Sequence, residues 1–355
     1  MEGLGMMTNF YKNKRVFVTG HTGFKGSWLC QTLVKLGADV IGYALEPEPG
    51  PNLFSICGLK TQMRTVFGDI RDHSHLQRII QSTRPEFVFH LAAQPIVRES
   101  YSDPRYTFET NVMGTVNLLE CVRKTGTVRS LVNVTTDKVY DNLETDKAYR
   151  EEDRLDGYDP YSNSKSCSEL VTHSYQRSFF TQQNIAISTA RAGNVIGGGD
   201  FAKDRIIPDC VRAAETKQDI LIRNPYSIRP YQHVLDPIFA YLLIAKRQYE
   251  NSDLQGCYNV GPDDRDCVST GQLADLFCEK WGGIHWIDQH DGGPHEAAFL
   301  KLDCGKLKEK MDWHPVWHIE TAVEKTVQWT RAYLSSGNPG KIMVQQIEEF
   351  IKEKG

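Results

Sequence analysis

No closely spaced pair of cysteines occurs in this sequence of 355 residues, and its nine cysteines are scattered along the chain. Disulfide frameworks and zinc sites use paired cysteines, so this pattern indicates reduced thiols and predicts a cytoplasmic protein. Long hydrophobic runs are also missing. The first twenty residues hold no apolar stretch of the signal-peptide type, and the most apolar later run, residues 237–245, is too short to span a bilayer. We therefore expect neither secretion nor membrane insertion.

An excess of charge is absent as well, because 41 Lys and Arg face 45 Asp and Glu, for a formal net charge of −4. This balance excludes a bulk attraction to nucleic acid or to an anionic membrane, so any anionic ligand must meet a local cluster of basic side chains. The chain is 40% hydrophobic and 24% charged, which is typical of a globular protein. Its length exceeds what one hydrophobic core usually organises, which predicts a large unit with a smaller lobe.

Short apolar runs alternate with helical patterns over the first 195 residues. We predict strands at 14–19, 39–45, 87–93, 131–135 and 185–190, with a further short strand before residue 68, and helices at 27–36, 75–81, 114–124 and 162–179. Parallel strands need long crossover connections and must be covered on both faces. The predicted fold class is therefore α/β, with a doubly wound parallel sheet.

The alternation breaks down after residue 195 into segments rich in Gly, Pro and Arg. We therefore predict a sheet domain over residues 1–195 that also takes in 232–262. Residues 196–231 and 263–335 are predicted to form a smaller mixed α/β lobe. Residues 336–355 are rich in Lys and Glu, and we expect them to form a charged C-terminal helix.

A glycine-rich turn, Gly-His-Thr-Gly-Phe-Lys-Gly at residues 20–26, lies between the first predicted strand and the first predicted helix. Glycines at such a turn let the backbone approach a pyrophosphate, whose charge is favoured by the free N–H groups at the helix start. The spacing is G-x-x-G-x-x-G rather than the usual G-x-G-x-x-G, so an ordinary tight turn is the alternative. The candidate cofactor-binding residues of this turn are Gly20, Thr22, Gly23, Phe24, Lys25 and Gly26.

The end of the second predicted strand bears on which dinucleotide would bind. Tyr43 and Leu45 stand where an acidic residue is usual, and Glu46 is the candidate for the ribose. No arginine lies there to hold a 2′-phosphate, which favours NAD over NADP. After the third short strand, Asp69 either contacts adenine or caps the following turn.

Tyr161 and Lys165 are four residues apart, so on a helix they share a face. A neighbouring cation favours phenolate and lowers the pKa of tyrosine, which would let Tyr161 act as a base toward a carbinol proton. The alternative for an isolated Y-x-x-x-K pattern is a solvated helix face. The pair follows the segment Thr136-Asp137-Lys138 in a chain that opens with the glycine turn, and this context favours the catalytic interpretation.

Several segments together resemble the extended short-chain dehydrogenases/reductases: the glycine turn, residues 90–94 (HLAAQ), residues 111–115 (NVMGT) and the Tyr161/Lys165 pair. The resemblance covers nearly the whole chain and implies a Rossmann-type NAD domain. The further NAD contacts that it implies are Ile70, Leu91, Ala92, Ala93 and Gln94. It also implies a homodimer, because the helix pair that carries the last two motifs commonly forms the dimer interface in this family.

A narrower set of motifs resembles the CDP-glucose 4,6-dehydratases. These motifs are residues 20–28 (GHTGFKGSW), 93–95 (AQP), 136–138 (TDK), 157–165 (GYDPYSNSK), 191–200 (RAGNVIGGGD), 223–229 (RNPYSIR) and 232–234 (QHV). The Asp137-Lys138 dipeptide discriminates most, because related dTDP-glucose and GDP-mannose dehydratases typically carry Asp-Glu there and the UDP-galactose epimerases carry small residues. Glu99, Val139 and Tyr231 depart from the pattern, which leaves the nucleotide and the hexose open.

This resemblance implies a lyase that removes water from a nucleotide-diphosphate hexose, with CDP-D-glucose as the first candidate. Tyr161 would take the proton of the 4-hydroxyl, with Lys165 and Thr136 positioning the phenol and the substrate oxygen. Asp137 would act as the acid at the departing C6 hydroxyl and Lys138 as the base at C5. These roles require a raised pKa for Asp137 and a lowered pKa for Lys138, whereas an ion pair would shift both the wrong way. We therefore expect a neutral pair in a dry site.

A substrate diphosphate needs a cationic pocket, and arginine suits this task because its planar fork can bind two phosphate oxygens. The basic side chains amid turn residues of the C-terminal half are Lys203, Arg205, Arg223 and Arg229. Each of them, taken singly, could equally be a solvated surface residue. The substrate contacts that the resemblance implies are Asn194, Arg205, Arg223, Asn224, Arg229 and His295. The histidines at 285, 290 and 295 form no H-E-x-x-H helix and lie near no cysteine pair, so no metal site is predicted.

Two other functions stay open at this stage. A nucleotide-sugar 4-epimerase or reductase would share the fold and would be recognised by C4 inversion, or by net cofactor turnover, without loss of water. A non-catalytic NAD-binding scaffold or sensor is an alternative of a different class. The presence of Tyr161, Lys165, Asp137 and Lys138 counts against it.

Overall fold

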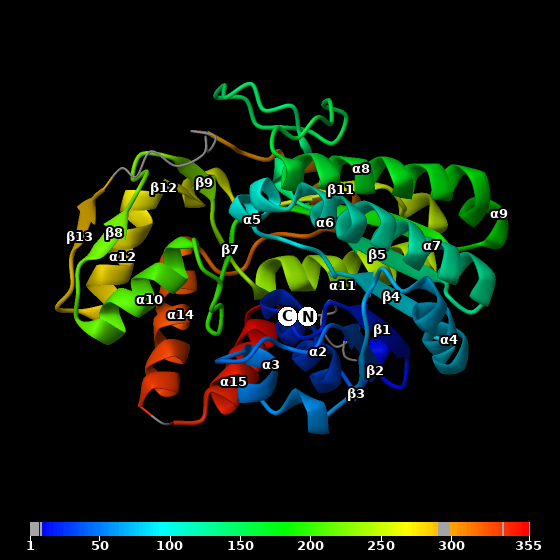
Figure 1. Cartoon of the computed structure of the whole chain (residues 1–355), viewed down its shortest axis with the longest axis horizontal. Coiled ribbons are helices and arrows are strands. Elements are labelled where there is room, and N and C mark those ends of the chain that lie inside the picture. Colours follow the sequence, from blue (N-terminus) through cyan, green and yellow to red (C-terminus); the bar gives the residue numbers. More distant parts are fainter. Residues whose placement is uncertain (1–6, 8, 290–298, 336, 355) are drawn as a thin grey trace.

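A sheet of seven parallel strands forms the centre of the protein, with the strand order β11-β6-β5-β4-β1-β2-β3 (Figure 1). The computed structural model describes residues 7, 9–289, 299–335 and 337–354. The strands are β1 (Arg15–Thr19), β2 (Asp39–Ala44), β3 (Arg64–Phe67), β4 (Phe87–His90), β5 (Ser130–Val134), β6 (Ala186–Ala192) and β11 (Cys257–Val260). The doubly wound parallel sheet predicted from the alternating patterns is confirmed.

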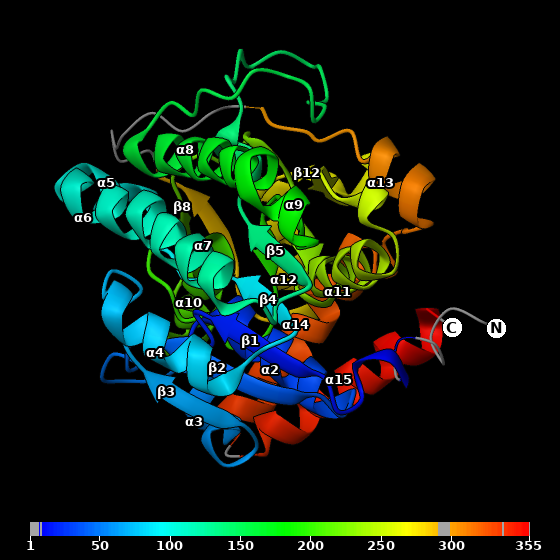
Figure 2. The same ribbon diagram turned by 90° about the vertical axis from the view of Figure 1, so that its right-hand side faces the viewer.

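Helices cover both faces of this sheet (Figure 2). They are α2 (Phe24–Lys35), α11 (Leu235–Glu250) and α15 (Pro339–Lys354) on one face, and α4 (His73–Thr83), α7 (Gly114–Thr125) and α8 (Pro160–Tyr175) on the other. Successive residues of a strand point to opposite faces, so each strand supplies two cores. Val16 and Val18 of β1 pack in the core beneath α2 and α11, whereas Phe17 packs in the core beneath α4 and α7. Because the strands are buried on both faces, their sequences are nearly continuous runs of apolar residues.

Among the element boundaries that differ from the sequence prediction, two shape the ends of β1 and β4. The helix predicted from residue 27 begins at Phe24, because the Gly23 carbonyl already accepts a hydrogen bond from Ser27 N at 2.8 Å. The strand predicted over 87–93 ends at His90, because the next two amides, of Leu91 and Ala92, donate to Thr19 Oγ1 at 3.1 Å. The ends of β1 and β4 are thereby tied together.

A smaller group of elements packs beside the sheet around its own core, which includes Ile207, Phe277 and Val323 (Figure 1). These elements are β7 (Val195–Ile196), α10 (Ile206–Thr216), β8 (Ile220–Ile222), β9 (Ile228–Pro230), β10 (Gln232–His233), β12 (Cys267–Ser269), α12 (Thr270–Trp281), β13 (Trp286–Asp288) and α14 (Ile319–Leu334). Between β10 and β12 the chain returns to the main sheet through α11 and β11.

Short helices fill the remaining connections: α3 (Leu53–Ile56), α5 (Val97–Ser102), α6 (Pro104–Phe108), α9 (Thr181–Gln183) and α13 (Gly305–Met311). The C-terminal helix α15 buries Met343, Ile347 and Phe350 against the main body and exposes its charged face. None of the helices that the structure describes combines the length and the apolar character that a membrane span requires.

Candidate active site

A cavity of about 890 Å³ opens at the carboxyl ends of β1 and β4. β1 leads to β2 and β3 on one side of the sheet, whereas β4 leads to β5 and β6 on the other, so the crossovers diverge here. Such a switch point leaves the crevice in which open α/β sheets bind ligands. Among the described residues proposed above for catalysis, cofactor or substrate, all line the wall except Glu46 and Gln94. His295 lies outside the described residues.

The glycine turn forms one wall of the cavity. A Cβ on Gly20, whose φ is +74°, would lie 2.7 Å from Ala92 N, and a Cβ on Gly26 would lie 2.1 Å from Gly20 O. Packing therefore requires these two glycines. Gly23 differs, because its φ is −75° and the nearest described atom to its Cβ would be Gly20 O at 3.4 Å. It lies at the N-terminus of α2, so the space beside it and the free N–H groups of that helix fit a pyrophosphate.

Replacing Gly23 with valine should therefore weaken NAD binding while leaving the fold intact. The added side chain enters the space left for the pyrophosphate, at a steric cost of about 1–3 kcal/mol, or roughly 5- to 150-fold in Kd. Calorimetric titration with NAD measures the affinity, and the thermal unfolding midpoint reports on the fold. Gly26→Val is the matched control, since it should lower the midpoint as well. An unchanged Kd for Gly23→Val would show that the pyrophosphate lies elsewhere.

At the end of β2, Tyr43 and Leu45 line the cavity, whereas Glu46, the candidate ribose contact, does not. Asp69 lies in the wall and also closes its own turn, because its carboxylate accepts hydrogen bonds from Arg71 N at 2.8 Å and from Arg71 Nη2 at 2.6 Å. The hydrogen bonds from Arg71 hold the pKa of Asp69 below its ordinary value.

Gln94 is buried, and its side chain closes the turn before α5 instead of entering the wall. Its amide donates to Thr107 Oγ1 at 2.9 Å and accepts from Ile96 N at 2.6 Å. Asn111 holds the Gln94 backbone, with its Oδ1 accepting from Gln94 N at 2.8 Å and its Nδ2 donating to Gln94 O at 3.0 Å. The residue thus shapes the segment that follows β4.

Tyr161 lies in the first turn of α8, which begins at Pro160 and is capped by Asp159. Burial raises the pKa of Tyr161 to about 12, although a hydrogen bond with Thr136 opposes this shift. The ammonium of Lys165 donates to Val134 O at 3.0 Å, at the end of β5. The lowered pKa expected for Tyr161 is therefore not found in this structure, because burial outweighs the groups that favour the phenolate.

Lys165 is itself buried, and burial lowers its pKa to about 8. The carboxylate of Glu169, one helical turn further along α8, opposes this shift. Sequence reasoning missed Glu169, although its position four residues after Lys165 could have indicated a helix neighbour.

Asp137 and Lys138 begin a short 3-10 turn, η3 (Asp137–Val139), directly after β5. Asp137 is 1% exposed, its Oδ1 accepts from Thr136 Oγ1 at 3.0 Å, and its Oδ2 has no hydrogen-bond partner among the described residues. Burial raises the pKa of Asp137 even though the positive charges of Lys138, Arg229 and Lys25 oppose it. A buried carboxyl with a raised pKa and an unused oxygen can hold a proton for a ligand.

Several basic side chains also line the cavity. Arg205 Nη1 pairs with Asp200 Oδ2 at 2.8 Å, and Arg223 Nη1 pairs with Asp204 Oδ1 at 2.7 Å. Sequence reasoning missed both aspartates, because neither spacing reveals a partner across a loop. Lys25 is also buried, and burial lowers its pKa to about 8, with Arg205 adding to the shift. Asn194, Asn224 and Arg229 complete this part of the wall.

Residues 17–326 match the family model described as GDP-mannose 4,6 dehydratase. The chain belongs to the GDP-mannose 4,6 dehydratase family. It is 48% identical over 333 residues to the CDP-glucose 4,6-dehydratase of Salmonella typhimurium, and this alignment covers 92% of the chain and 93% of that protein. Family membership confirms the resemblance predicted from the motifs.

Solved structures show that this member of the dehydratase family shares its fold with epimerases as well. The UDP-glucose 4-epimerase of Thermotoga maritima, solved with UDP-glucose, matches with a TM-score of 0.79 and 25% identity over 90% of this chain and 99% of that chain. The dTDP-glucose 4,6-dehydratase of Bacillus anthracis, solved with NAD, matches with a TM-score of 0.76 and 23% identity over 92% of this chain and 99% of that chain. The fold therefore does not decide between the two reactions, and the side chains must.

Proposed function

We propose that this chain is an NAD-dependent 4,6-dehydratase of a nucleotide-diphosphate hexose and that its substrate is CDP-D-glucose. The observation that carries the proposal is that Asp137 and Lys138 line the same cavity as Tyr161. A site that only oxidises a carbinol needs a base such as Tyr161, whereas loss of water also needs an acid and a second base. The 48% identity to the CDP-glucose 4,6-dehydratase of Salmonella typhimurium supports this reaction and this nucleotide.

The cofactor would lie between the glycine turn and the segment that follows β4, where the wall includes Gly23, Ala92 and Lys165. When bound, NAD accepts a hydride from C4 of the hexose and returns it to C6 later in the same turnover. The space beside Gly23 and the N-terminus of α2 fit its pyrophosphate.

Oxidation at C4 requires removal of a proton from the 4-hydroxyl, and Tyr161 is the base that accepts it. The proton moves to the phenolate oxygen as the hydride leaves C4, so the carbinol becomes a ketone. Thr136 contacts the phenol, and Lys165, anchored on Val134 O, lines the same cavity. The ketone then acidifies the proton on C5.

Elimination requires an acid and a base on neighbouring carbons. Lys138 takes the C5 proton, and Asp137 donates a proton to the C6 hydroxyl, which leaves as water. Once C6 has regained a hydride, Lys138 returns a proton to C5. The product is the 4-keto-6-deoxy sugar, and the cofactor is oxidised again.

The nucleotide diphosphate would bind the basic part of the wall. Arg205 and Arg223 line the cavity, and Asp200 and Asp204 partly balance their charges. Arg229 lies close enough to Asp137 to affect its pKa. Planar guanidinium groups suit phosphate oxygens because they can donate two parallel hydrogen bonds. His295, which lies outside the described residues, belongs to the proposed contact set on the basis of the resemblance alone.

The test is to incubate the purified protein with CDP-, dTDP-, UDP- and GDP-hexoses in heavy water, with NAD and without added reductant. A product lighter by one water, with a 4-ketone and one solvent deuteron on C5, is expected from CDP-D-glucose. Inversion at C4 without loss of water would instead establish an epimerase, and net formation of NADH would establish a simple dehydrogenase. No turnover of any nucleotide hexose would favour a binding protein.

We further propose a cytoplasmic homodimer. All nine cysteines are free thiols, as expected for a reducing compartment. The π-helical turn η2 (Glu109–Met113) packs beside α8, and these two elements expose Met113 (51%) and Leu170 (56%). A second copy covering these side chains should give a mass near twice 40.3 kDa by sedimentation equilibrium. Leu170→Glu should lower it to the monomer mass, and a monomeric parent chain would exclude the dimer.

A further inference from the structure

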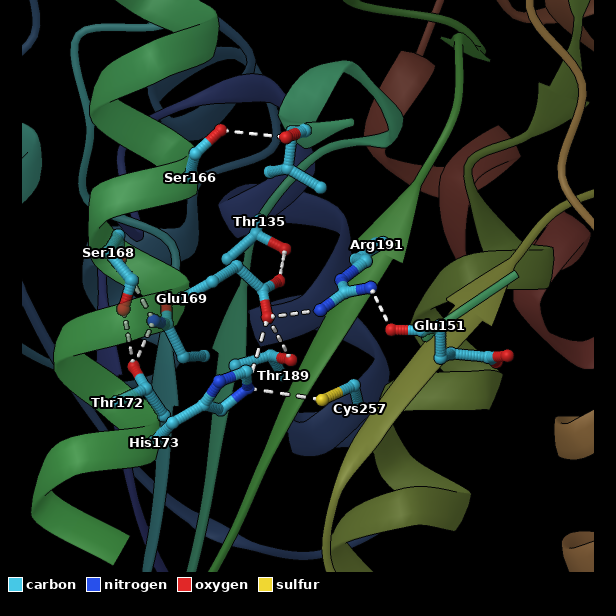
Figure 3. A network of polar contacts seen from close by, with 12 residues as sticks. Thr135, Glu151, Ser166, Ser168, Glu169, Thr172, His173, Thr189, Arg191 and Cys257 are labelled. Atoms are coloured by element: carbon cyan, nitrogen blue, oxygen red, sulfur yellow. Dashed lines mark hydrogen bonds and ion pairs between the residues drawn. The ribbon is translucent and has the colours of Figure 1, made fainter. Parts of the chain in front are cut away.

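A buried ion pair lies behind the cavity, and the mechanism above does not use it (Figure 3). Glu169 on α8 and Arg191 on β6 are joined by a 2.9 Å contact between Oε2 and Nη2. The two side chains are 0% and 1% exposed. Burying such a pair removes the hydration of both charges, so its net contribution to the stability of the fold is small or unfavourable. Its contacts therefore require an explanation of another kind.

The Glu169 end of the pair contacts the side chain of Thr135, just before the proposed catalytic segment. Thr135 Oγ1 donates to Glu169 Oε1 at 2.5 Å, and Thr189 Oγ1 donates to Glu169 Oε2 at 2.6 Å (Figure 3). Thr135 directly precedes Thr136 and Asp137. Burial alone would raise the pKa of Glu169, but the Arg191 guanidinium and these hydroxyls together lower it, so the carboxylate is charged at neutral pH.

The Arg191 end of the pair contacts the side chain of Tyr140, just after the same segment. Arg191 Nη1 donates to Tyr140 Oη at 2.9 Å and to the Glu151 carbonyl at 3.0 Å. The guanidinium also lies over the Tyr140 ring, 5.1 Å from its centroid. Tyr140 follows Lys138 by two residues and is anchored further by a 2.6 Å hydrogen bond to Asn259 Oδ1.

We propose that Glu169 and Arg191 are a positioning pair that clamps residues 135–140 at both ends and so fixes the acid and the base of the elimination step. This inference rests on the proposed function, because it concerns the orientation of Asp137 and Lys138. A displacement of about 1 Å in a reacting group can cost on the order of 100-fold in rate, so a rigid anchor outside the cavity has catalytic value.

The same cluster also contains the one group with the spacing of metal ligands in the described part of the chain, namely Glu169, His173 and Cys257. Glu169 already binds Arg191 and two hydroxyls, and His173 Nε2 lies 3.1 Å from Cys257 Sγ. Burial raises the pKa of the Cys257 thiol, which opposes the thiolate that a metal needs. The clamp therefore accounts for the contacts of Glu169 without a metal.

The test compares two threonines that donate to one carboxylate. Thr135→Val removes the hydroxyl attached to the catalytic segment, whereas Thr189→Val removes the equivalent hydroxyl from the middle of β6. Neither substitution leaves Arg191 without its carboxylate, so both variants should fold. For Thr135→Val we expect kcat to fall about tenfold or more with KM within about twofold, and for Thr189→Val we expect kcat within about twofold.

Measuring the individual reaction steps distinguishes a loss of positioning from a loss of folded protein, because unfolding would slow every step equally. In single turnovers, Thr135→Val should slow C5 deuterium exchange more than it slows C4 hydride transfer, while Thr135→Ser, which keeps the hydroxyl, should restore both. Tyr140→Phe tests the other end of the clamp and should also slow the exchange. Equal losses for Thr135→Val and Thr189→Val, or an unchanged kcat for Thr135→Val, would overturn the clamp. Failure of the unmodified chain to form any 4-keto sugar would instead overturn the proposed function.

Discussion

Replacing Tyr161 with phenylalanine should lower kcat for the 4-keto product by about 10²- to 10⁴-fold. The phenol is the proposed base for the first step, so neither hydride transfer nor the later elimination can proceed without it. Stopped-flow absorbance of the reduced nicotinamide measures the first step directly, and product assay measures the whole turnover. Tyr158→Phe is the matched control, because Tyr158 lies three residues earlier, is 80% exposed and is outside the cavity wall. Similar losses in both variants would remove Tyr161 from the role of base.

The raised pKa of Tyr161 also sets the direction of a pH effect. With a pKa of about 12, the phenol is protonated at neutral pH and the phenolate fraction rises tenfold with each pH unit. The rate of C4 oxidation should therefore increase with pH below the working pKa. The positive charge of a bound oxidised nicotinamide should shift this rise in rate to lower pH, since a nearby cation favours phenolate. A rate of C4 oxidation that falls as pH rises would contradict this assignment.

Replacing Asp137 with asparagine should stop the reaction after C4 oxidation. The asparagine keeps the shape and the contact with Thr136 but cannot donate a proton to the leaving 6-hydroxyl, so kcat should fall by about 10²- to 10⁴-fold. Deuterium should still enter C5, because Lys138 is unchanged. Lys138→Ala is the complementary variant, in which C4 oxidation persists and C5 exchange is lost. The labelled 4-keto intermediate is measured by mass spectrometry.

Two further results bear on Asp137. Its raised pKa keeps the carboxyl protonated to higher pH than a free aspartate, and since the acid form is the active one, elimination should slow as pH rises through that pKa. The unfolding midpoint of Asp137→Asn should not fall, because the substitution removes a buried carboxylate whose Oδ2 has no described partner. Normal water loss in this variant would transfer the role of acid to another group.

Local patterns in the sequence were sufficient to predict the sheet. The apolar run of β1 and the crossover helices require a parallel sheet buried on both faces, and the doubly wound sheet provides it. The glycine turn, Tyr161 and Asp137 could also be located, because their chemistry depends on spacing within one turn or one helix. The start of α2 at Phe24 and the end of β4 at His90 were missed, because each is decided by a hydrogen bond within the folded turn.

Contacts between distant segments could not be predicted in this way. Gln94 was expected to face the cofactor, but Asn111 and Thr107 hold it in the turn before α5. Arg205 pairs with Asp200 of its own loop, and Arg223 pairs with Asp204 of that same loop; irregular loop geometry leaves no periodic signal for either pair. The raised pKa of Tyr161 likewise follows from burial, which depends on the whole fold.

The amino-acid sequence by itself determined the class of fold, the family and the identity of the proposed acid and bases, because each of these depends on residue types at short, regular spacing. Only the tertiary structure decided which other residues support the segments that carry the proposed acid and bases. Glu169 and Arg191 are 22 positions apart on a helix and a strand, and packing of α8 on β6 makes them one buried pair. Burial and distance set the pKa values and the rigidity of the site, and neither is encoded by any local motif.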